Sequence, residues 1–172
     1  MDGADRRSRI FEILLDASVP ITGSELAGRF NVSRQIIVQD IALMRASGQD
    51  IVATPQGYIL AQTLTGGKLI KIIPCQHGWV ELEKELNIIV DNGGKVLDVS
   101  VEHPLYGELK GMLMLASRRD VRRFVDNLQK SSAKPLSALT SGIHLHRVEA
   151  SSEEIFVNIE RDLALAGILL EK

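Results

Sequence analysis

The chain has 172 residues, with 20 Lys and Arg, 22 Asp and Glu, 4 His and 1 Cys. An apolar fraction of 45% with 24% charged residues is ordinary globular composition, which excludes a disordered chain, and the length suits one large or two small domains. The single cysteine excludes an intrachain disulfide framework and favours a reducing compartment. No apolar run approaches the roughly 18–20 residues of a membrane span, and the first residues lack the apolar core of a signal peptide, so we expect a cytoplasmic protein.

The first 62 residues predict three short helices and a β-hairpin. Apolar residues at helical spacing indicate a first helix over 6–16. A second helix is expected to begin after Thr22, which has a glutamate three positions later in the spacing of a capping box. Ser33 has the position of the N-cap of a third, longer helix. Two apolar runs, 51–54 and 58–60, flank a Pro-Gln-Gly turn and predict the hairpin.

A stretch of small residues, 63–67, predicts a linker to a second domain of residues 68–172. In this domain the apolar patterns alternate between strand and helix. Strands are expected at 69–73, 96–101 and 110–115 and within 139–148, and helices at 78–90, after Ser117 and after Ser152. The order β-α-β-β-α-β-α is typical of a ferredoxin-like split βαβ arrangement, here with an extra C-terminal helix. The whole chain is therefore predicted to be an α+β protein.

Two short helices joined by a tight turn and followed by a hairpin are typical of a winged helix-turn-helix, a module that reads DNA. Arg pairs with guanine and Gln with adenine, while hydroxyls and free amides hold phosphates. The candidate DNA contacts are the outward polar residues of the third helix and the wing: Ser33, Arg34, Gln35, Gln39, Thr54 and Gln56. The net charge of -2 provides no global attraction to DNA, and similar modules also serve as dimer or protein-interaction domains.

All four histidines lie in the second domain. His144 and His146 share one face of a predicted strand, because side chains two positions apart in a strand point the same way. His77 follows the first strand, which in this fold usually neighbours the last one, and Glu85 on the next helix offers a carboxylate. Three imidazoles and one carboxylate suit zinc, nickel, iron or cobalt. The alternative is that the histidine pair is solvated and that His77 and the glutamates belong to the surface.

The single cysteine, Cys75, lies two positions before His77. A lone cysteine is most simply a buried small residue. As a metal ligand it would form a second i, i+2 pair with His77, and we keep this as an option. The four arginines between 118 and 123 offer a partner for a carboxylate, although on a helix they are more typical of a solvated face or a dimer edge.

The two domains resemble two known families. Residues 32–41, with the preceding 21–27 and the wing, resemble the recognition region of the biotin-repressor type of winged helix. Three histidine-containing segments, 74–78, 101–108 and 141–146, resemble the three-histidine (3H) domain. The two domains in this order resemble the niacin-responsive repressors of NAD biosynthesis, and the resemblance covers nearly the whole chain.

This resemblance implies a ligand set and a function. The metal ligands of the family correspond to His77, Glu85, His144 and His146, and the metal is expected to be nickel, zinc or a similar ion. The family effector is nicotinic acid, for which His103 and Tyr106 are the candidate pocket residues. The resemblance therefore implies a non-enzymatic repressor of NAD-biosynthesis or niacin-uptake genes, with nicotinic acid as co-repressor. Because an operator has two half-sites, we expect a homodimer on double-stranded DNA.

Two other functions stay open at this point. A winged-helix regulator of the same build would respond to the metal itself. A metal-dependent hydrolase fused to a DNA-binding domain is the third interpretation, because a metal with an open position activates water. Against the enzyme, no general base stands out beyond the ligands and no nucleophile motif is present.

Overall fold

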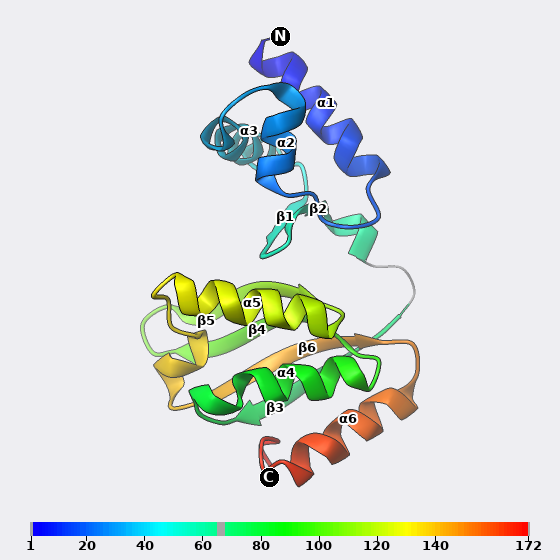
Figure 1. Cartoon of the computed structure of the whole chain (residues 1–172), viewed down its shortest axis with the longest axis vertical. Helices are drawn as coiled ribbons and strands as arrows, with labels where there is room; N and C mark the ends of the chain where they lie inside the picture. Colours follow the sequence, from blue (N-terminus) through cyan, green and yellow to red (C-terminus); the bar gives the residue numbers. More distant parts are fainter. Residues whose placement is uncertain (1, 65–67, 172) are drawn as a thin grey trace. The chain divides into compact units, whose positions relative to one another are not determined.

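A computed structural model describes residues 2–64 and 68–171 of the chain. The chain divides into two compact units, residues 1–67 and 68–172, and each has its own hydrophobic core (Figure 1). Thr63 and Leu64, predicted to begin the linker, instead complete a short 3-10 helix, and the rest of that linker, 65–67, lies outside the described residues. Among the described residues, none of the helices has the length and apolar character needed to cross a membrane.

The first unit contains the three helices and the hairpin that were predicted. Its elements are α1 (Gly3–Asp16), α2 (Gly23–Phe30), α3 (Arg34–Ala46), β1 (Ile51–Thr54), β2 (Gly57–Leu60) and the 3-10 helix η1 (Ala61–Leu64). α1 begins three residues earlier than expected, because the Asp2 carboxylate accepts the N–H of Asp5 at 2.8 Å and caps the helix. The core is formed mainly by residues of the three helices, among them Ile10, Leu14 and Leu26.

Side-chain caps define where α2 and α3 begin. Thr22 Oγ1 accepts the N–H of Glu25 at 3.1 Å, and Ser33 Oγ accepts the N–H of Ile36 at 3.3 Å. These caps confirm both predicted helix starts. Glu25 binds Arg29 of the same helix at 2.8 Å, so its carboxylate serves an i, i+4 ion pair.

The second unit is a four-stranded antiparallel sheet with helices packed against it (Figure 1). Its elements are β3 (Leu69–Gln76), the 3-10 helix η2 (Trp79–Glu81), α4 (Leu82–Asp91), β4 (Lys95–His103), β5 (Gly107–Leu115), α5 (Arg118–Lys130), the 3-10 helix η3 (Leu136–Thr140), β6 (Ile143–Ala150) and α6 (Glu153–Leu165). Apolar residues of all four strands and of α4, α5 and α6 form one core, which includes Ile73, Leu86, Val121 and Phe156.

The strand order in space is β3-β6-β4-β5. Each crossover helix therefore spans one intervening strand: α4 connects β3 to β4 across β6, and α5 connects β5 to β6 across β4. These split βαβ units confirm the predicted α+β class, and the first and last strands are neighbours as expected. The strand order differs from that of a ferredoxin-like sheet. The central strands here are β4 and β6, the second and fourth strands of the unit, whereas the first and third strands are central in ferredoxin. The burial of β4 and β6 along most of their length fits this central position.

Several boundaries in the second unit differ from the prediction or refine it. β3 continues through Pro74 to Gln76, because an edge strand tolerates a proline that donates no ladder hydrogen bond. The helix expected over 78–90 begins with the 3-10 turn η2, and α4 proper starts at Leu82. The strand predicted within 139–148 begins at Ile143, because η3 occupies the preceding residues.

Candidate metal centre and DNA-binding surface

Helix α3 has one apolar and one polar side. Its apolar side, with Ile37 and Met44, is buried in the core of the first unit. The polar side carries four of the predicted DNA contacts, all of them exposed: Ser33, Arg34, Gln35 and Gln39. They lie at or near the N-terminal end of the helix, where backbone N–H groups without helical partners favour phosphate. A helix with one side buried in the core and a polar side exposed is typical of the recognition helix of a helix-turn-helix domain.

The wing hairpin is fixed against the segment that leads into α2. Tyr58 and Ile21 exchange two backbone hydrogen bonds of 2.8 and 2.9 Å. Gly57, with φ +128°, approaches so closely that a Cβ there would lie 2.3 Å from the Ile21 carbonyl oxygen. The hydroxyl of Thr54 donates to the Gly57 carbonyl and accepts the N–H of Gln56, at 2.9 and 3.1 Å. Thr54, predicted as a DNA contact, therefore also builds the turn of the wing.

A surface hollow of about 240 Å³ lies between the wing hairpin and the N-terminal ends of α2 and α3. Its lining includes Arg34 and Thr54, two of the six predicted DNA contacts, together with Thr22 and Ser24. A guanidinium and several hydroxyls beside a helix N-terminus are typical of a site that holds an anion such as a DNA phosphate.

A buried ion pair connects α3 to α1. Asp40, which is 3% exposed, lies 2.5 Å from Arg6 Nε and 3.4 Å from Arg7 Nη1. The hydrogen bond from Arg6 to Asp40 raises the pKa of the guanidinium. Sequence reasoning missed this pair, because the partners lie 34 positions apart on different helices. The pair fixes the inner side of the recognition helix.

In the second unit, the four predicted metal ligands converge from three parts of the fold. His77 follows β3, Glu85 lies in the first turn of α4, and His144 and His146 alternate along β6. The pairing of β3 with β6 brings the end of β3 beside the histidine pair. The two exposed residues next to this pair, Ile143 and Leu145, point away from the core.

The Glu85 carboxylate lies at the centre of the cluster. Its Oε2 is 2.6 Å from His77 Nε2, and its Oε1 is 2.8 Å from His144 Nε2 and 3.2 Å from His146 Nε2. The contact with His146 lacks hydrogen-bond geometry, so this Nε2 is a buried nitrogen without a hydrogen-bond partner among the described residues. All four side chains are at most 3% exposed.

Backbone carbonyl groups orient all three imidazoles. Each Nδ1 lies 2.7 or 2.8 Å from a carbonyl oxygen. A carbonyl only accepts, so each Nδ1 donates its N–H to the carbonyl, and the Nε2 atom of each ring faces the cluster centre. The acceptors are the carbonyls of Gly78, Gly142 and Asp98. Metal-binding histidines are oriented in the same manner.

The charges of the cluster support each other. Burial alone would raise the pKa of Glu85, but attraction to His146 and hydrogen bonds from His144 and His77 hold it well below its usual range. Burial alone would lower the pKa of His77 and of His146, and Glu85 outweighs this effect, so both values are raised. The cluster therefore holds a buried carboxylate ringed by imidazole nitrogens, which is a donor set for a cation.

Cys75 belongs to the same cluster. The donor atoms of Cys75, Glu85 and His144 all lie within 4.8 Å of one another. Burial raises the pKa of the thiol well above its usual range, and the charge of Glu85 adds to the effect. The thiol is therefore protonated in the metal-free protein and faces the carboxylate.

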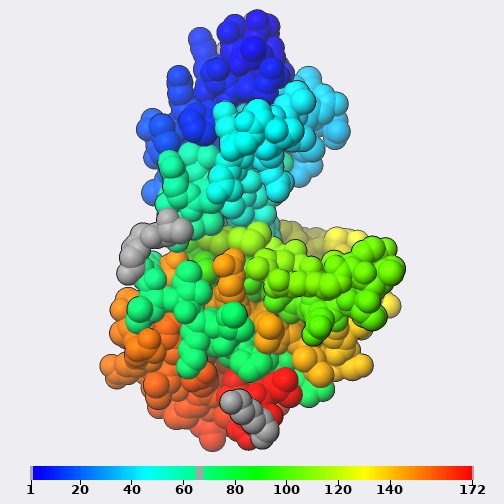
Figure 2. All heavy atoms as spheres, turned by 180° about the vertical axis from the view of Figure 1, so that it is seen from behind, coloured from blue at the N-terminus to red at the C-terminus, as the bar shows by residue number. Residues whose placement is uncertain are grey.

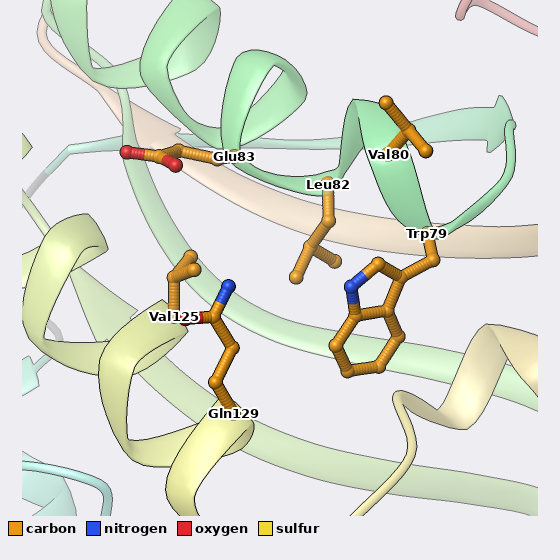
Figure 3. Close-up of a pocket in the computed structure, with 6 residues that line it drawn as sticks. All are labelled: Trp79, Val80, Leu82, Glu83, Val125 and Gln129. Carbon is orange, nitrogen blue, oxygen red and sulfur yellow. The ribbon is translucent and has the colours of Figure 1, made fainter.

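Two small pockets flank Trp79, the single tryptophan of the chain. One, of about 170 Å³, adjoins His77 and is lined in part by Ser137 and Gly142. The other, of about 190 Å³, lies between α4 and α5, and Figure 3 shows the indole of Trp79 across it from Val125 and Gln129 on α5. The first pocket is the one beside the imidazole cluster.

The predicted effector residues lie in the β4–β5 hairpin. His103 Nδ1 accepts the N–H groups of Leu105 and Tyr106 at 3.2 and 3.3 Å. The rings of His103 and Tyr106 stack with centroids 5.0 Å apart, and Tyr106 is 69% exposed. Neither residue lines the pocket beside His77. Their role as effector contacts stays a prediction.

Sequence reasoning missed the groups that orient the predicted ligands. These groups are backbone carbonyls, which every residue has, so the residue type does not indicate which of them accept a hydrogen bond. Gly142 is the exception. Its φ is +89°, and a Cβ there would lie 2.4 Å from the carbonyl oxygen of His77. The glycine two positions before the histidine pair was therefore a signal of close backbone approach.

A winged helix-turn-helix joined to a separate domain with a buried ligand cluster defines a two-domain DNA-binding regulator. Residues 6–59 match the model of an HTH domain, and residues 70–172 match that of the 3H domain. The chain is 42% identical over 170 residues to the probable transcription repressor NiaR of Thermotoga maritima, and 41% identical over 171 residues to the transcription repressor NadR of Bacillus subtilis. Each comparison covers 98% of this chain and 95% of the relative. The chain belongs to this family of transcription repressors, in which an HTH domain precedes a 3H domain.

Proposed function

We propose that this protein represses genes of NAD biosynthesis or niacin uptake, with nicotinic acid as co-repressor and a metal ion in the second unit. The observation that supports the proposal most is the convergence of three imidazoles on one buried carboxylate, in a chain that belongs to a family of repressors. The proposal places the protein in the cytoplasm, where its operator DNA is.

The donor set fits a divalent transition metal such as nickel or zinc. His77, Glu85, His144 and His146 would hold the ion through nitrogen and carboxylate oxygen. The fit is supported by the unpartnered His146 Nε2 and by the carbonyl groups that turn all three Nε2 atoms inward. An ion that accepts more donors than these four would offer an open position to a carboxylate or a pyridine nitrogen.

Nicotinic acid has two candidate positions in the second unit. The first is the hairpin of His103 and Tyr106, as expected from the resemblance. The second is the pocket of about 170 Å³ beside His77, where the indole of Trp79 offers a flat apolar wall. Calorimetric titration of nicotinic acid into Tyr106→Ala and Trp79→Ala, each with metal present, separates the two. The position whose variant loses affinity is the effector site.

Repression requires two copies and a coupling between the units. Each α3 would read one half-site of an operator, with the half-sites about 34–36 Å apart on one face of the DNA. The effector must bind the DNA-competent arrangement of the dimer more tightly than the other arrangement. Such couplings are typically about 1–3 kcal/mol, or roughly 5- to 150-fold in affinity.

The test is a fluorescence-anisotropy titration on DNA from upstream of a NAD-synthesis operon, at fixed salt. Its arms are chelated protein, metal alone, metal with nicotinic acid, and metal with nicotinamide. We expect tightening of roughly 5- to 150-fold only with metal and nicotinic acid together. DNA affinity that follows the metal alone would favour a metal-responsive regulator, and sound DNA binding that no ligand alters would contradict the sensor. Turnover of an amide or ester by the metal-loaded protein would instead favour the hydrolase.

A further inference from the structure

Cys75 lies directly opposite His144 in the pairing of β3 with β6. Residues opposite each other in an antiparallel pair point to the same side of the sheet, with Cβ atoms about 4.5–5.5 Å apart. Both residues are buried, with exposed fractions of 0% and 2%. The thiol therefore enters the imidazole cluster from the strand next to the one that carries the histidine pair.

The donor distances are close to those that one ion requires. The sulfur of Cys75, a carboxylate oxygen of Glu85 and a ring nitrogen of His144 lie within 4.8 Å of one another. Metal bonds to sulfur are about 2.3 Å and those to nitrogen or oxygen about 2.0–2.2 Å, so two donors on one ion are at most about 4.5 Å apart. A small side-chain adjustment would bring the three donors to one ion. A second group, the unpartnered buried Nε2 of His146, belongs to the same cluster.

A purely structural cysteine would have its sulfur surrounded by hydrocarbon. Cys75 does contribute to the hydrophobic core, where Ile73 on the same strand is its neighbour. Its sulfur, however, also lies within 4.8 Å of a carboxylate oxygen of Glu85, and this carboxylate itself contacts three imidazoles. Packing alone gives no reason for a polar contact of this kind.

We infer that Cys75 binds the metal through its sulfur, as an additional ligand beside His77, Glu85, His144 and His146. The bond to the metal replaces the S–H bond, and the thiol proton leaves to solvent. This inference rests on the metal site of the proposed function. Because thiolate is a soft donor, the mixed nitrogen, oxygen and sulfur set favours cobalt, nickel and zinc over manganese and magnesium.

The experiment is a cobalt(II) titration of the full chain after removal of metal with a chelator. Visible d–d absorption reports bound cobalt, and near-ultraviolet thiolate-to-cobalt absorption reports a sulfur ligand. Because Cys75 is the single cysteine of the chain, any thiolate band comes from this residue. We expect both signals to rise together and to saturate together, and a large excess of manganese or magnesium to leave them unchanged.

Two variants complete the design. Cys75→Ser should keep the visible bands, lose the near-ultraviolet band and bind cobalt at least about tenfold more weakly. The double variant His144→Ala with His146→Ala should lose both signals. Visible bands without a thiolate band in the wild-type protein would overturn the role of Cys75 and leave the metal site standing. Absence of all cobalt absorption would overturn the metal site itself, and with it the metal-dependent sensor.

Discussion

Gly142 determines how closely the two histidine-bearing segments approach each other. It contacts the backbone of His77, and its carbonyl accepts the Nδ1–H of His144 at 2.8 Å. Its φ of +89° lies in the left-handed region, where a side chain costs roughly 1–2 kcal/mol. A residue outside the predicted ligand set thus controls the positions of two predicted ligands.

We predict that Gly142→Ala weakens metal binding at least about tenfold, although every ligand is retained. The added Cβ would displace the His77 carbonyl and separate His77 from Glu85. Metal affinity is measured by competition with a chromophoric chelator, and thermal unfolding is followed on the same samples.

The matched control is Gly48→Ala. Gly48 has φ +94° and nothing within 4 Å of an added Cβ, so this variant carries the backbone strain without the contact. It should lower the melting temperature and leave metal affinity unchanged. Equal metal affinity in both variants and the wild type would show that the approach of Gly142 to His77 does not shape the site.

Arg34 is the predicted DNA contact for which we expect the largest effect. It is exposed at the start of α3 and lines the hollow between helix pair and wing. Arg34→Ala should weaken specific operator binding by about 1–3 kcal/mol, or roughly 5- to 150-fold, and leave metal content intact. Anisotropy at fixed salt measures the loss, with Arg45→Ala at the far end of the same helix as control. Normal operator binding by Arg34→Ala would mean that α3 is not the recognition helix.

At the scale of elements, the orientation of α3 depends on the ion pair between Asp40 and Arg6. Asp40→Ala would leave the partly buried Arg6 guanidinium without its partner. Breaking a buried pair typically costs 3–5 kcal/mol, and we expect about 2–3 kcal/mol because Arg6 keeps 15% exposure. Arg7→Ala, at the longer and more exposed contact, should cost less than about 1 kcal/mol. Urea unfolding curves measure both, and equal losses would contradict the assignment of Arg6 as the main partner.

Elements with a local signal could be predicted from the sequence. Thr22, Ser33 and Ser117 each cap a helix through a hydrogen bond that spans three residues, so residue type at one position identifies the start. The i, i+2 spacing of His144 and His146 is a local signal as well, and it predicted that both side chains lie on the same face of the sheet.

Elements that depend on distant partners could not be predicted. β3 passes through Pro74 only because it is an edge strand, and the 3-10 helix η3 before β6 was not predicted. The same limit applies to the site. The four predicted ligands could be proposed from residue type and strand adjacency, whereas the position of Cys75 opposite His144 depends on the register of β3 against β6.

At the scale of the molecule, the two units have separate hydrophobic cores, and the candidate metal centre belongs to the second alone. Metal should therefore stabilise only the second unit, by about 2.7 kcal/mol at a concentration 100 times the dissociation constant. Trp79 fluorescence reports the second unit selectively, because it is the single tryptophan. Far-ultraviolet circular dichroism reports both units.

The expected result is a metal-dependent rise in the melting temperature seen by Trp79, with a separate dichroism phase that does not move. In the double variant His144→Ala with His146→Ala, the chelator should have no effect on either signal. A shift of both phases by the same amount in the wild type would show that the two units unfold as one.

The groups that orient the imidazoles belong to the main chain at Gly78, Gly142 and Asp98. A substitution replaces a side chain and leaves the carbonyl oxygen in place. The hydrogen bonds that orient the imidazoles therefore persist as long as the backbone keeps its conformation. A new side chain at residue 98 would leave its carbonyl oxygen in place as long as the strand keeps its path, although it would also remove the buried carboxylate that pairs with Arg147. Divergence at such positions would therefore carry no information about loss of the centre. Loss of the metal centre would be visible in the sequence only at the predicted ligands and at Gly142, the glycine that allows their approach.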